Sequence, residues 1–285
     1  MTVRLKPKEL PKVPVEAYCI TPDEFAGKTV EELRNLTLWV GKRRRRLGDL
    51  FEVYGEAGDS AEDTEIVVEG DVPTVKYIGY EMTAGRIVIQ GRSGAHTGAK
   101  MSGGEIVVEG DVGEWSGAEM SGGVLRIRGN ADHFLGASYL GSPFGMTGGA
   151  IIVHGSVGGE ACRGMRRGLL VVLGDAGEFL GADMVAGTII VFGRAGRGLG
   201  AHMGNKGAVI VVHGGVEEMP PTFVYDATYS PTFIRLLMRE LHRTYGVEEA
   251  SRYMDAVYDR YHGDLAEGGG GEIFLLSDRK RLTNT

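Results

Sequence analysis

Methionine recurs at a nearly fixed interval through the middle of the chain. Seven methionines follow one another at spacings of 19, 19, 26, 19, 19 and 19 residues. Each belongs to the same pattern, G-x-x-M-x-x-G-x-I-x-V-x-G, as in GAKMSGGEIVVEG at 98–110. A regular period of this kind indicates a protein built from stacked structural repeats. The repeated methionines are Met82, Met101, Met120, Met146, Met165, Met184 and Met203.

The I-x-V part of each repeat predicts a short strand with two inward side chains, because alternate residues of a strand share one side. Stacked repeats would align these residues into two ladders. The expected ladders are Ile87, Ile106, Leu125, Ile151, Leu170 and Ile189, and Ile89, Val108, Ile127, Val153, Val172 and Val191. The methionines would form a third ladder, and the many glycines, 47 in all, suit tight corners.

Parallel crossovers are nearly always right-handed. The sequence therefore predicts a mainly β fold, a right-handed parallel β-helix (solenoid) of about seven 19-residue coils with a C-terminal α-helical segment. Three regions are expected. They are an N-terminal extension at 1–63 with a short helix and strands, the β-helix at 64–219, and a C-terminal helical cap and tail at 220–285. The long methionine gap predicts a loop inserted at 138–145.

The N-terminal extension has its own local signals. TPDEF at 21–25 is typical of a helix start, with Thr21 as the cap and Glu24 three residues later. Residues 28–41 begin like a helix and end like a strand, and residues 48–56 are typical of a strand and turn. Between them stands a dense basic run, Lys42, Arg43, Arg44, Arg45 and Arg46. This run is either a solvated turn or a surface for an anionic tail or an acidic partner.

The C-terminal region carries helical signals. Residues 230–246 predict a helix, with Ser230 at the N-cap, Pro231 at the first position and Gly246 at the end. Residues 247–263 predict a second helix. The pair is expected to cover the open end of the stack, which would otherwise expose unpaired strand edges. Residues 268–276 predict a flexible turn and a last strand.

The outward positions of the strands change character along the repeats. In the first three repeats they are mixed, whereas later they become apolar, which is typical of a strand buried on both faces. The chain's own C-terminal helices or a partner protein would cover them. Together with Arg43, Arg44, Arg45 and Arg46, the candidate interface residues are Leu169, Val171, Leu173, Ile190 and Phe192.

Patterns that carry catalysis or bind metals are missing from the sequence. It has no P-loop pattern and no G-x-S-x-G elbow, and its two cysteines, Cys19 and Cys162, lie far apart. The seven histidines show no metal-ligand spacing, and His154 and His213 are expected at the surface. A line of methionines could bind a metal, but no His, Asp or Glu recurs with them. We therefore predict no catalytic, cofactor-binding or metal-binding residue in this chain, although a Ser-His-Asp arrangement stays open.

Charge and hydropathy limit the other function classes. The formal net charge is -7, which argues against a general nucleic-acid binder. The charged, proline-containing start is unlike a signal peptide, and the apolar runs are shorter than the ~18 residues that a membrane span needs. The expectation is a cytoplasmic protein that contacts neither nucleic acid nor membrane.

The repeat, with its lead-ins GDLFEVYGE and IGYEMTAGRIVIQG, resembles the C subunit of formylmethanofuran dehydrogenase. The segment PKVPVEAYCITPDEFAGKTVEEL is similar to the same family, and the resemblance covers about residues 1–219. The repeat alone is also similar to the C-terminal β-helix domain of glutamate synthase large subunits. The C-terminal stretches SPTFIRLLMREL and YHGDLAEGGGGEI resemble versions in the bacterial formyltransferase/hydrolase complex.

The resemblance implies a scaffold, the C subunit, within a hetero-oligomer of one-carbon metabolism or methanogenesis. In the archaeal complex, an oxidoreductase, partner subunits carry a molybdenum or tungsten pterin and iron–sulfur clusters and reduce carbon dioxide onto methanofuran. In the bacterial complex they transfer or hydrolyse the formyl group. Because the family assigns this chemistry to other subunits, no cofactor is expected in this chain and no catalytic residue is carried over.

Two further interpretations remain beside the scaffold. One is a glutamate-synthase-type β-helix domain that exists as a separate chain. The other is a stand-alone β-helix enzyme acting on polysaccharide or acyl groups, which would need a groove with clustered Asp, Arg or His on one outer face. The apolar outward positions count against that enzyme.

Overall fold

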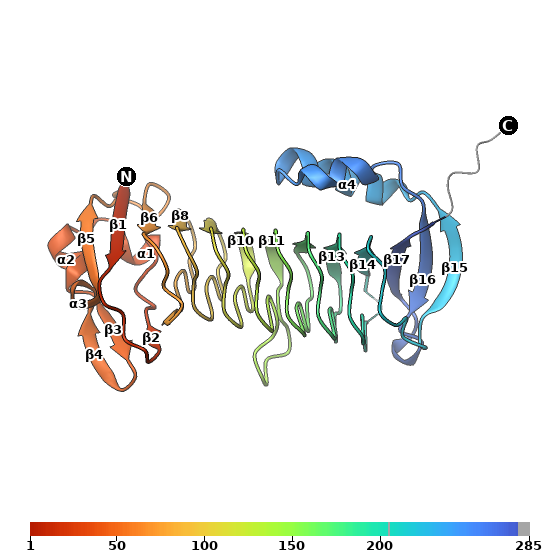
Figure 1. Cartoon of the computed structure of the whole chain (residues 1–285), viewed down its shortest axis with the longest axis horizontal. Helices are drawn as coiled ribbons and strands as arrows, with labels where there is room; N and C mark the ends of the chain where they lie inside the picture. The colour runs from red at the N-terminus through yellow and green to blue at the C-terminus, as the bar shows by residue number, and fades with distance from the viewer. Residues whose placement is uncertain (205, 279–285) are drawn as a thin grey trace.

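The computed structural model describes residues 1–204 and 206–278, and the fold is mainly β with few helices (Figure 1). Its larger sheet has 13 strands, in the order β15-β16-β17-β14-β13-β12-β11-β10-β9-β8-β6-β1-β5. A smaller sheet has 4 strands, in the order β4-β3-β2-β7. The strands of the repeats lie side by side along the long axis of the molecule, which makes it elongated (Figure 1).

The strands of the repeats pair in parallel, each with the strand of the next repeat. Ile106 lies opposite Ile87 on one side and Leu125 on the other, and the same register continues to Ile210. Both expected ladders are confirmed, and their side chains are fully buried. The strands are β6 (Glu65–Val68), β8 (Arg86–Ile89), β9 (Glu105–Val108), β10 (Ser121–Ile127), β11 (Gly148–Val153), β12 (Leu169–Val172), β13 (Gly187–Val191) and β14 (Ala208–Val212).

A second line of parallel contacts runs along the repeats beside the sheet. It consists of single bridges between equivalent residues, beginning with Val72 to Ser93 and Ser93 to Val112, and ending with Ala195 to Val216. Each repeat therefore touches the next through a strand and again through a bridge a few residues later. This double attachment fixes the position of the corner between the two contacts.

Several of the methionines lie against a glycine of the following repeat at this corner of the stack. All seven methionines are fully buried, as expected for a packing ladder. Gly104 has a φ of +74°, and a Cβ built on it would lie 2.5 Å from Met82 Cε. Gly123 has a φ of +76°, and a Cβ there would lie 2.7 Å from Met101 Cε. Glycine is thus required at these positions for two reasons. The backbone is left-handed, and the methionine tip leaves no room for a Cβ.

Strands from both ends of the chain close the two edges of the stack. At the N-terminal end, β1 (Thr2–Pro7) pairs in parallel with β6 and in antiparallel with β5 (Phe51–Gly55). At the C-terminal end, β17 (Gly271–Leu276) pairs in parallel with β14, followed by the antiparallel strands β16 (Tyr258–Gly263) and β15 (Val224–Tyr229). The strand expected within 268–276 is confirmed.

The N-terminal extension follows its local signals. Thr21 accepts a hydrogen bond from the backbone N–H of Glu24, and a capping box joins Thr29 and Glu32. The expected strand within 48–56 is β5, although a short helix precedes it. The elements are α1 (Pro22–Phe25), α2 (Val30–Arg34), α3 (Leu47–Leu50), β2 (Val15–Glu16), β3 (Thr37–Val40), β4 (Arg43–Arg46) and β7 (Val75–Lys76).

The predicted pair of C-terminal helices is partly wrong. Helix α4 (Thr232–Thr244) forms, but residues 247–263 give a 3-10 helix, η1 (Glu248–Tyr253), and then strand β16. That strand is held on both sides by β15 and β17, and Arg260 Nε donates to Glu272 Oε1 across the pairing at 2.8 Å. Strands therefore close the end of the stack, while α4 lies along the outward side of the repeats (Figure 1).

The start of α4 differs from the expectation by one residue. Pro231 occupies the N-cap position in place of Ser230, and no side chain caps this end. Gly246 follows the end of the helix with a φ of +69°, in agreement with its expected role. In the described part of the chain, no helix is both long enough and apolar enough to cross a lipid bilayer. A further 3-10 helix, η2 (Leu265–Glu267), lies between β16 and β17.

The inner ladder should dominate the stability of the stack. Replacing Leu125 with Ala removes a fully buried side chain from the middle of the ladder and should lower the free energy of unfolding by about 2–5 kcal/mol. The matched control is Val124→Ala on the same strand, whose side chain is half-buried on the other face. Denaturant unfolding followed by circular dichroism measures both variants. Equal losses in the two variants would contradict the inward assignment of Leu125.

Candidate functional site

The apolar outward face of the later strands is covered by the C-terminal segment of the same chain. Val171 and Ile190 are fully buried in a second core with Ile234, Met238 and Leu241, which lie on α4. At the edges of this core, partly buried side chains pack against it, among them Leu169, Leu173 and Phe192. The sequence allows either the chain's own C-terminal helices or a partner protein as the cover. In the structure, helix α4 of the same chain covers this face. A partner contact through these five interface candidates stays a prediction.

His213 lies inside this cover, so its expected place at the surface is wrong. Its side chain is 7% exposed, and its Nε2 lies 2.9 Å from Tyr258 Oη. The ring stacks on Phe192 and packs against Tyr253, with centroid distances of 4.8 and 4.0 Å. Burial lowers the pKa of His213 to about 4. The equivalent His154 remains half-buried.

An aromatic column runs along one corner of the first four full repeats. Tyr77, His96, Trp115 and Phe134 are 19 residues apart and share a left-handed backbone with φ between 61° and 64°. Tyr77 stacks on His96 and Trp115 stacks on Phe134, each with a centroid distance of 4.4 Å. Left-handed φ costs a residue other than glycine about 1–2 kcal/mol. Stacking of the rings offsets part of that cost.

The predictions from sequence do not include this column, although a signal exists. The four residues occupy one position of the 19-residue period, just as the methionines do. Their types differ, so no single letter marks the position. Tyr18 of the N-terminal extension adds to the column by stacking on Tyr77 at a centroid distance of 4.3 Å. The column thus joins the extension to the repeats.

The inserted loop at 138–145 is confirmed, and the aromatic column anchors it. Tyr139 Oη lies 2.8 Å from His96 Nδ1, and its ring stacks on Trp115 at 5.1 Å between centroids. Near the other end of the loop, the guanidinium of Arg166 lies 4.5 Å from the centre of the Phe144 ring. Leu140 at the tip is 93% exposed. The loop therefore projects a single apolar side chain from a fixed base.

Two adjoining hollows share Arg163 and Asp183, and the first of them borders this loop. One, of about 290 Å³, lies between Trp115, Phe134 and the inserted loop, and the other, of about 260 Å³, contains Phe179. Arg163 Nε lies 3.0 Å from Asp183 Oδ2, and its Nη1 lies 2.6 Å from Glu160 Oε2. These two carboxylates balance the charge of the arginine. The surface offers aromatic faces and paired charges, which suit binding, and it contains no nucleophile next to a general base.

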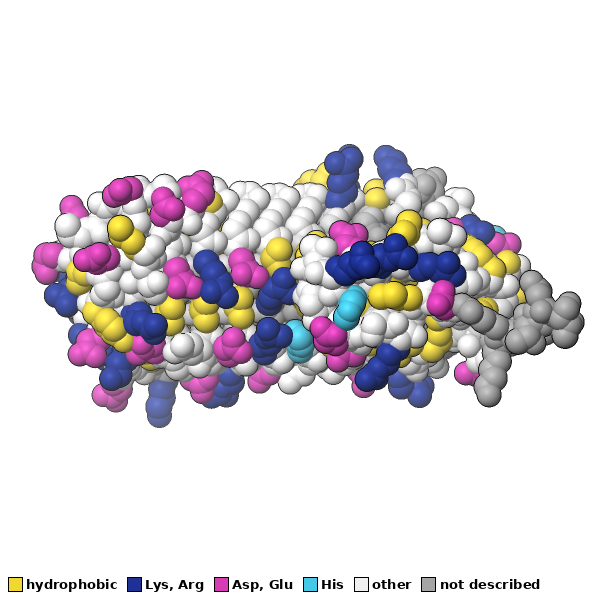
Figure 2. Space-filling model, turned by 90° about the horizontal axis from the view of Figure 1, so that it is seen from above, with side chains coloured by type: hydrophobic (Ala, Val, Ile, Leu, Met, Phe, Trp, Pro, Cys, Tyr) yellow, Lys and Arg dark blue, Asp and Glu magenta, His cyan; other side chains and the backbone are white. Residues whose placement is uncertain are grey.

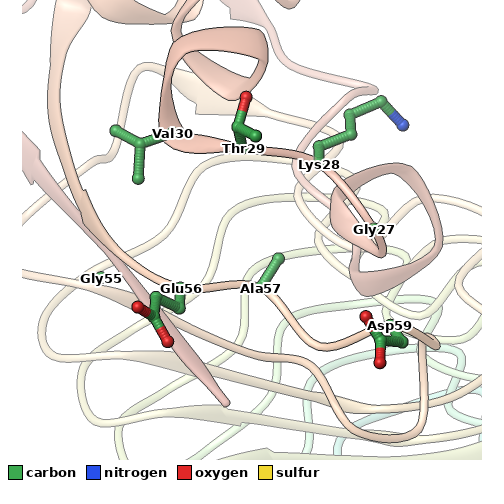
Figure 3. A pocket seen from close by; sticks show the side chains of 8 residues that line it. All are labelled: Gly27, Lys28, Thr29, Val30, Gly55, Glu56, Ala57 and Asp59. Atoms are coloured by element: carbon green, nitrogen blue, oxygen red, sulfur yellow. The ribbon is translucent and has the colours of Figure 1, made fainter.

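The N-terminal extension contains another open hollow, of about 400 Å³ (Figure 3). One wall carries Lys28 and Thr29, and the other carries Glu56 and Asp59. Thr29 is already engaged, since its side chain caps α2. The remaining lining is made of glycine, alanine and valine. No residue of this lining is a histidine or a cysteine.

Arg43–Arg46 form strand β4, in which all four residues are exposed, and Lys42 lies in the turn before it. Arg44 Nη2 donates to Thr37 Oγ1 at 3.2 Å, and its guanidinium lies 5.8 Å from the centre of the Trp39 ring. The arginines from Arg44 to Arg46 line a hollow of about 400 Å³ together with Asp49. We call residues 37–46, from β3 to β4, the basic hairpin. It lies at the end of the molecule opposite β15 (Figure 1).

Metal-ligating residues do not converge within residues 1–204 and 206–278. No group of three His, Cys, Asp or Glu residues there is arranged to hold an ion. Cys19 and Cys162 are free and buried, and burial raises the pKa of the Cys162 thiol to about 12. The thiol therefore stays protonated near neutral pH and is a poor ligand and nucleophile.

The fold defines a mainly β repeat protein with, in the described residues, no assembled metal site. No family model matches the chain. The chain is 50% identical over 95 residues to the C subunit of the tungsten-containing formylmethanofuran dehydrogenase 2 of Methanothermobacter thermautotrophicus, covering 33% of this chain and 35% of the relative. It is 45% identical over 94 residues to the C subunit of the molybdenum-containing formylmethanofuran dehydrogenase 1 of Methanosarcina barkeri, covering 33% and 31%. The chain thus matches about a third of the length of these curated relatives.

A solved structure matches nearly the whole chain. It is a chain of the crystal structure of the formyltransferase/hydrolase complex (FhcABCD) from Methylorubrum extorquens in complex with methylofuran. The TM-score is 0.86 at 28% identity, over 96% of this chain and 99% of that chain. Together, these comparisons confirm the resemblance to the C subunit of formylmethanofuran dehydrogenase and to a chain of the bacterial complex.

The anchor of the inserted loop can be tested at Tyr139. Tyr139→Ala should remove both the contact with His96 and the stack on Trp115, so that the loop moves freely. Limited trypsin digestion monitored by mass spectrometry should then cut at Arg163 or Arg166, which adjoin the loop, at least tenfold faster. Tyr139→Phe keeps the stack and should show a smaller increase. Unchanged digestion of the alanine variant would contradict the anchoring role.

The buried histidine predicts a pH-dependent stability. The pKa of His213 is about 4 in the folded chain and about 6.5 when unfolded, so the unfolded state binds the proton more readily. The stability present above pH 6.5 should therefore be lost progressively as the pH falls toward 4. His213→Phe keeps the stack on Phe192 and removes the titrating group. Thermal unfolding between pH 7 and pH 4.5 should show a smaller fall in Tm for the variant, and equal falls would contradict the assignment.

Proposed function

We propose that this chain is a scaffold, equivalent to the C subunit, in a complex that processes formylmethanofuran. The observation that carries the proposal is the match of 96% of the chain to a chain of the formyltransferase/hydrolase complex. The local identity of 50% to the C subunit of a formylmethanofuran dehydrogenase supports the same conclusion. The work of such a scaffold is to hold other subunits together.

The architecture that we propose for this role is a right-handed parallel β-helix. The parallel register, the second line of bridges and the buried methionines support it. We divide the chain into an N-terminal extension at 1–63, the β-helix at 64–219 and a C-terminal region at 220–285. In this division β15, β16 and β17 protect the last strand edge, and α4 covers one face. A β-helix with closed ends is rigid, which suits a scaffold.

The leading candidate for the reaction of the whole complex is that of formylmethanofuran dehydrogenase, an oxidoreductase, running toward or away from carbon dioxide. The named relatives are subunits of such enzymes. The alternative is a formyltransferase/hydrolase complex, and one observation favours it. A chain of the bacterial complex shares the fold over 96% of this chain, which includes most of the C-terminal region.

Cofactor chemistry belongs to the partners in this proposal. The names of the relatives point to tungsten or molybdenum in their complexes. The described residues of this chain do not fit such a group. They place no three ligating side chains together, and both cysteines are buried and protonated. We therefore derive no reaction step from this chain, and we expect it to act in the cytoplasm without contact to nucleic acid or membrane.

Partner contacts are expected at the surfaces that the chain leaves open. The exposed Leu140 on its anchored loop and the basic hairpin, with Arg43, Arg44, Arg45 and Arg46, are such surfaces. A rigid base with an exposed apolar tip resembles the anchor residues of protein interfaces. The margins of the covered face at Leu169, Leu173 and Phe192 are a further candidate, together with the buried Val171 and Ile190 that support them.

Affinity purification of the tagged chain from its native host tests this function. We expect stoichiometric co-purification of subunits similar to the catalytic or formyl-transferring subunits of these complexes, identified by mass spectrometry. The complex should turn over formylmethanofuran, and the chain purified alone should show neither turnover nor bound metal. Tungsten or molybdenum in the complex would assign the dehydrogenase, whereas formyl transfer without either metal would assign the alternative. Turnover by the isolated chain would overturn the scaffold proposal.

A further inference from the structure

The basic hairpin carries a concentration of charge that the described chain does not neutralise. Lys42 and the four arginines of β4 are all exposed. Within residues 1–204 and 206–278, none of their side chains forms an ion pair with a carboxylate. Most other strand arginines differ, as at Arg86, whose guanidinium contacts Glu65 and Glu105. The hairpin therefore has unused capacity for anions.

The carboxylate nearest to the hairpin is used by the backbone. Asp49 lines the same hollow, and its Oδ2 accepts the backbone N–H of Arg46 at 3.0 Å. This hydrogen bond also shows how the backbone groups of β4 are oriented, because the N–H of Arg46 points away from β3. Backbone groups of a strand alternate in direction, so Arg44 presents its N–H and C=O to the same open side. The outer edge of β4 thus offers guanidinium groups and one free backbone pair together.

The position of β4 keeps this edge open. In the smaller sheet, β4 is the last strand and pairs with β3 alone. Trp39, which is 40% exposed, lies opposite Arg44 in the register, and Arg44 is held over it by the bond to Thr37. Arg44 is therefore partly fixed, which lowers the entropy lost when it binds a carboxylate. An aromatic ring beside the arginines also gives an extended chain an apolar surface to lie on.

Charge complementarity identifies the occupant as an acidic protein segment. Guanidinium groups bind carboxylates through paired, charge-assisted hydrogen bonds. The chain carries a net charge of -7, and the five basic residues account for +5 of it, so the rest of the chain carries -12. The negative charge of the rest of the chain would repel the part of a long polyanion, such as a nucleic acid, that extends beyond the hairpin. A peptide can use the free backbone pair at the edge, whereas the sugar–phosphate backbone of a nucleic acid has no N–H donor to match it.

We propose that an acidic, extended segment of a partner protein binds along the open edge of β4. Its carboxylates pair with the guanidinium groups of Arg43, Arg44, Arg45 and Arg46, and its backbone bonds to the backbone of Arg44. The proposal rests on the assembly function, because it names the chemistry by which one partner protein is recognised. Association through such an array is steered by charge and weakens as salt rises.

A synthetic dodecapeptide of alternating Glu and Thr tests the chemistry of this edge. Calorimetric titration of the full chain at about 50 mM salt should give binding that is at least tenfold tighter than for the matched Gln and Thr peptide, and that weakens by 150 mM salt. Trp39 fluorescence should change on binding in a Trp115→Phe background, where it is the only tryptophan. Equal binding of both peptides, or tighter binding of a single-stranded DNA 12-mer, would overturn the proposal.

The triple variant Arg43→Ser, Arg45→Ser, Arg46→Ser should lose at least tenfold in peptide affinity. A matched control removes the same charge from exposed arginines elsewhere, at Arg239, Arg243 and Arg252, and should bind as the unaltered chain does. Thermal unfolding verifies that both variants are folded. Unchanged affinity in the triple variant would place binding elsewhere and overturn the assignment.

Purification of the complex separates this proposal from the assembly function. If the unaltered chain recovers its partner subunits and the triple variant loses at least one of them at 150 mM salt, the proposal is supported. If the triple variant recovers every partner in full and binds the acidic peptide normally, the proposal fails while the assembly function stands. If the unaltered chain recovers no such partner, the assembly function itself fails, whatever the peptide result.

Discussion

Contact between a methionine and a glycine of the next repeat sets the geometry on which the rest of the structure depends. Met82 beneath Gly104 and Met101 beneath Gly123 fix how closely successive repeats approach at this corner. The strand register and the line of bridges keep to the same repeat. Aromatic rings one repeat apart can stack only because the spacing is regular. The same regularity holds the inserted loop, since its tyrosine reaches across two neighbouring repeats.

The interior is predicted well from the sequence because the residues that form it recur with the 19-residue period. Each ladder residue is repeated, so the pattern survives a variation such as Leu125 in place of isoleucine. The glycines are predicted for the same reason. The aromatic column also follows the period, but its members share a backbone conformation and not a residue type. A pattern of letters therefore does not mark it, whereas backbone angles do.

The C-terminal region is predicted less well, because its structure depends on partners distant in the sequence. The local pattern of residues 258–263 favours a helix, yet Tyr258 and its neighbours become a strand because β17 and β15 lie on either side. His213 would lie at the surface if its own repeat alone decided its place. It is buried because η1 and β16 return over it. Both errors arise from contacts that the repeat pattern does not contain.

Because the repeats stack at a fixed spacing, the distance between the two ends of the molecule changes only by whole repeats. The basic hairpin lies at one end and β15 at the other (Figure 1), and the face seen from above carries both acidic and basic side chains (Figure 2). Adding or removing one repeat would move the ends by one strand spacing, about 4.8 Å. Proteins bound at the two ends would keep a separation that side-chain substitutions hardly alter. Such a molecule can evolve new surfaces while the dimensions of its assembly stay constant.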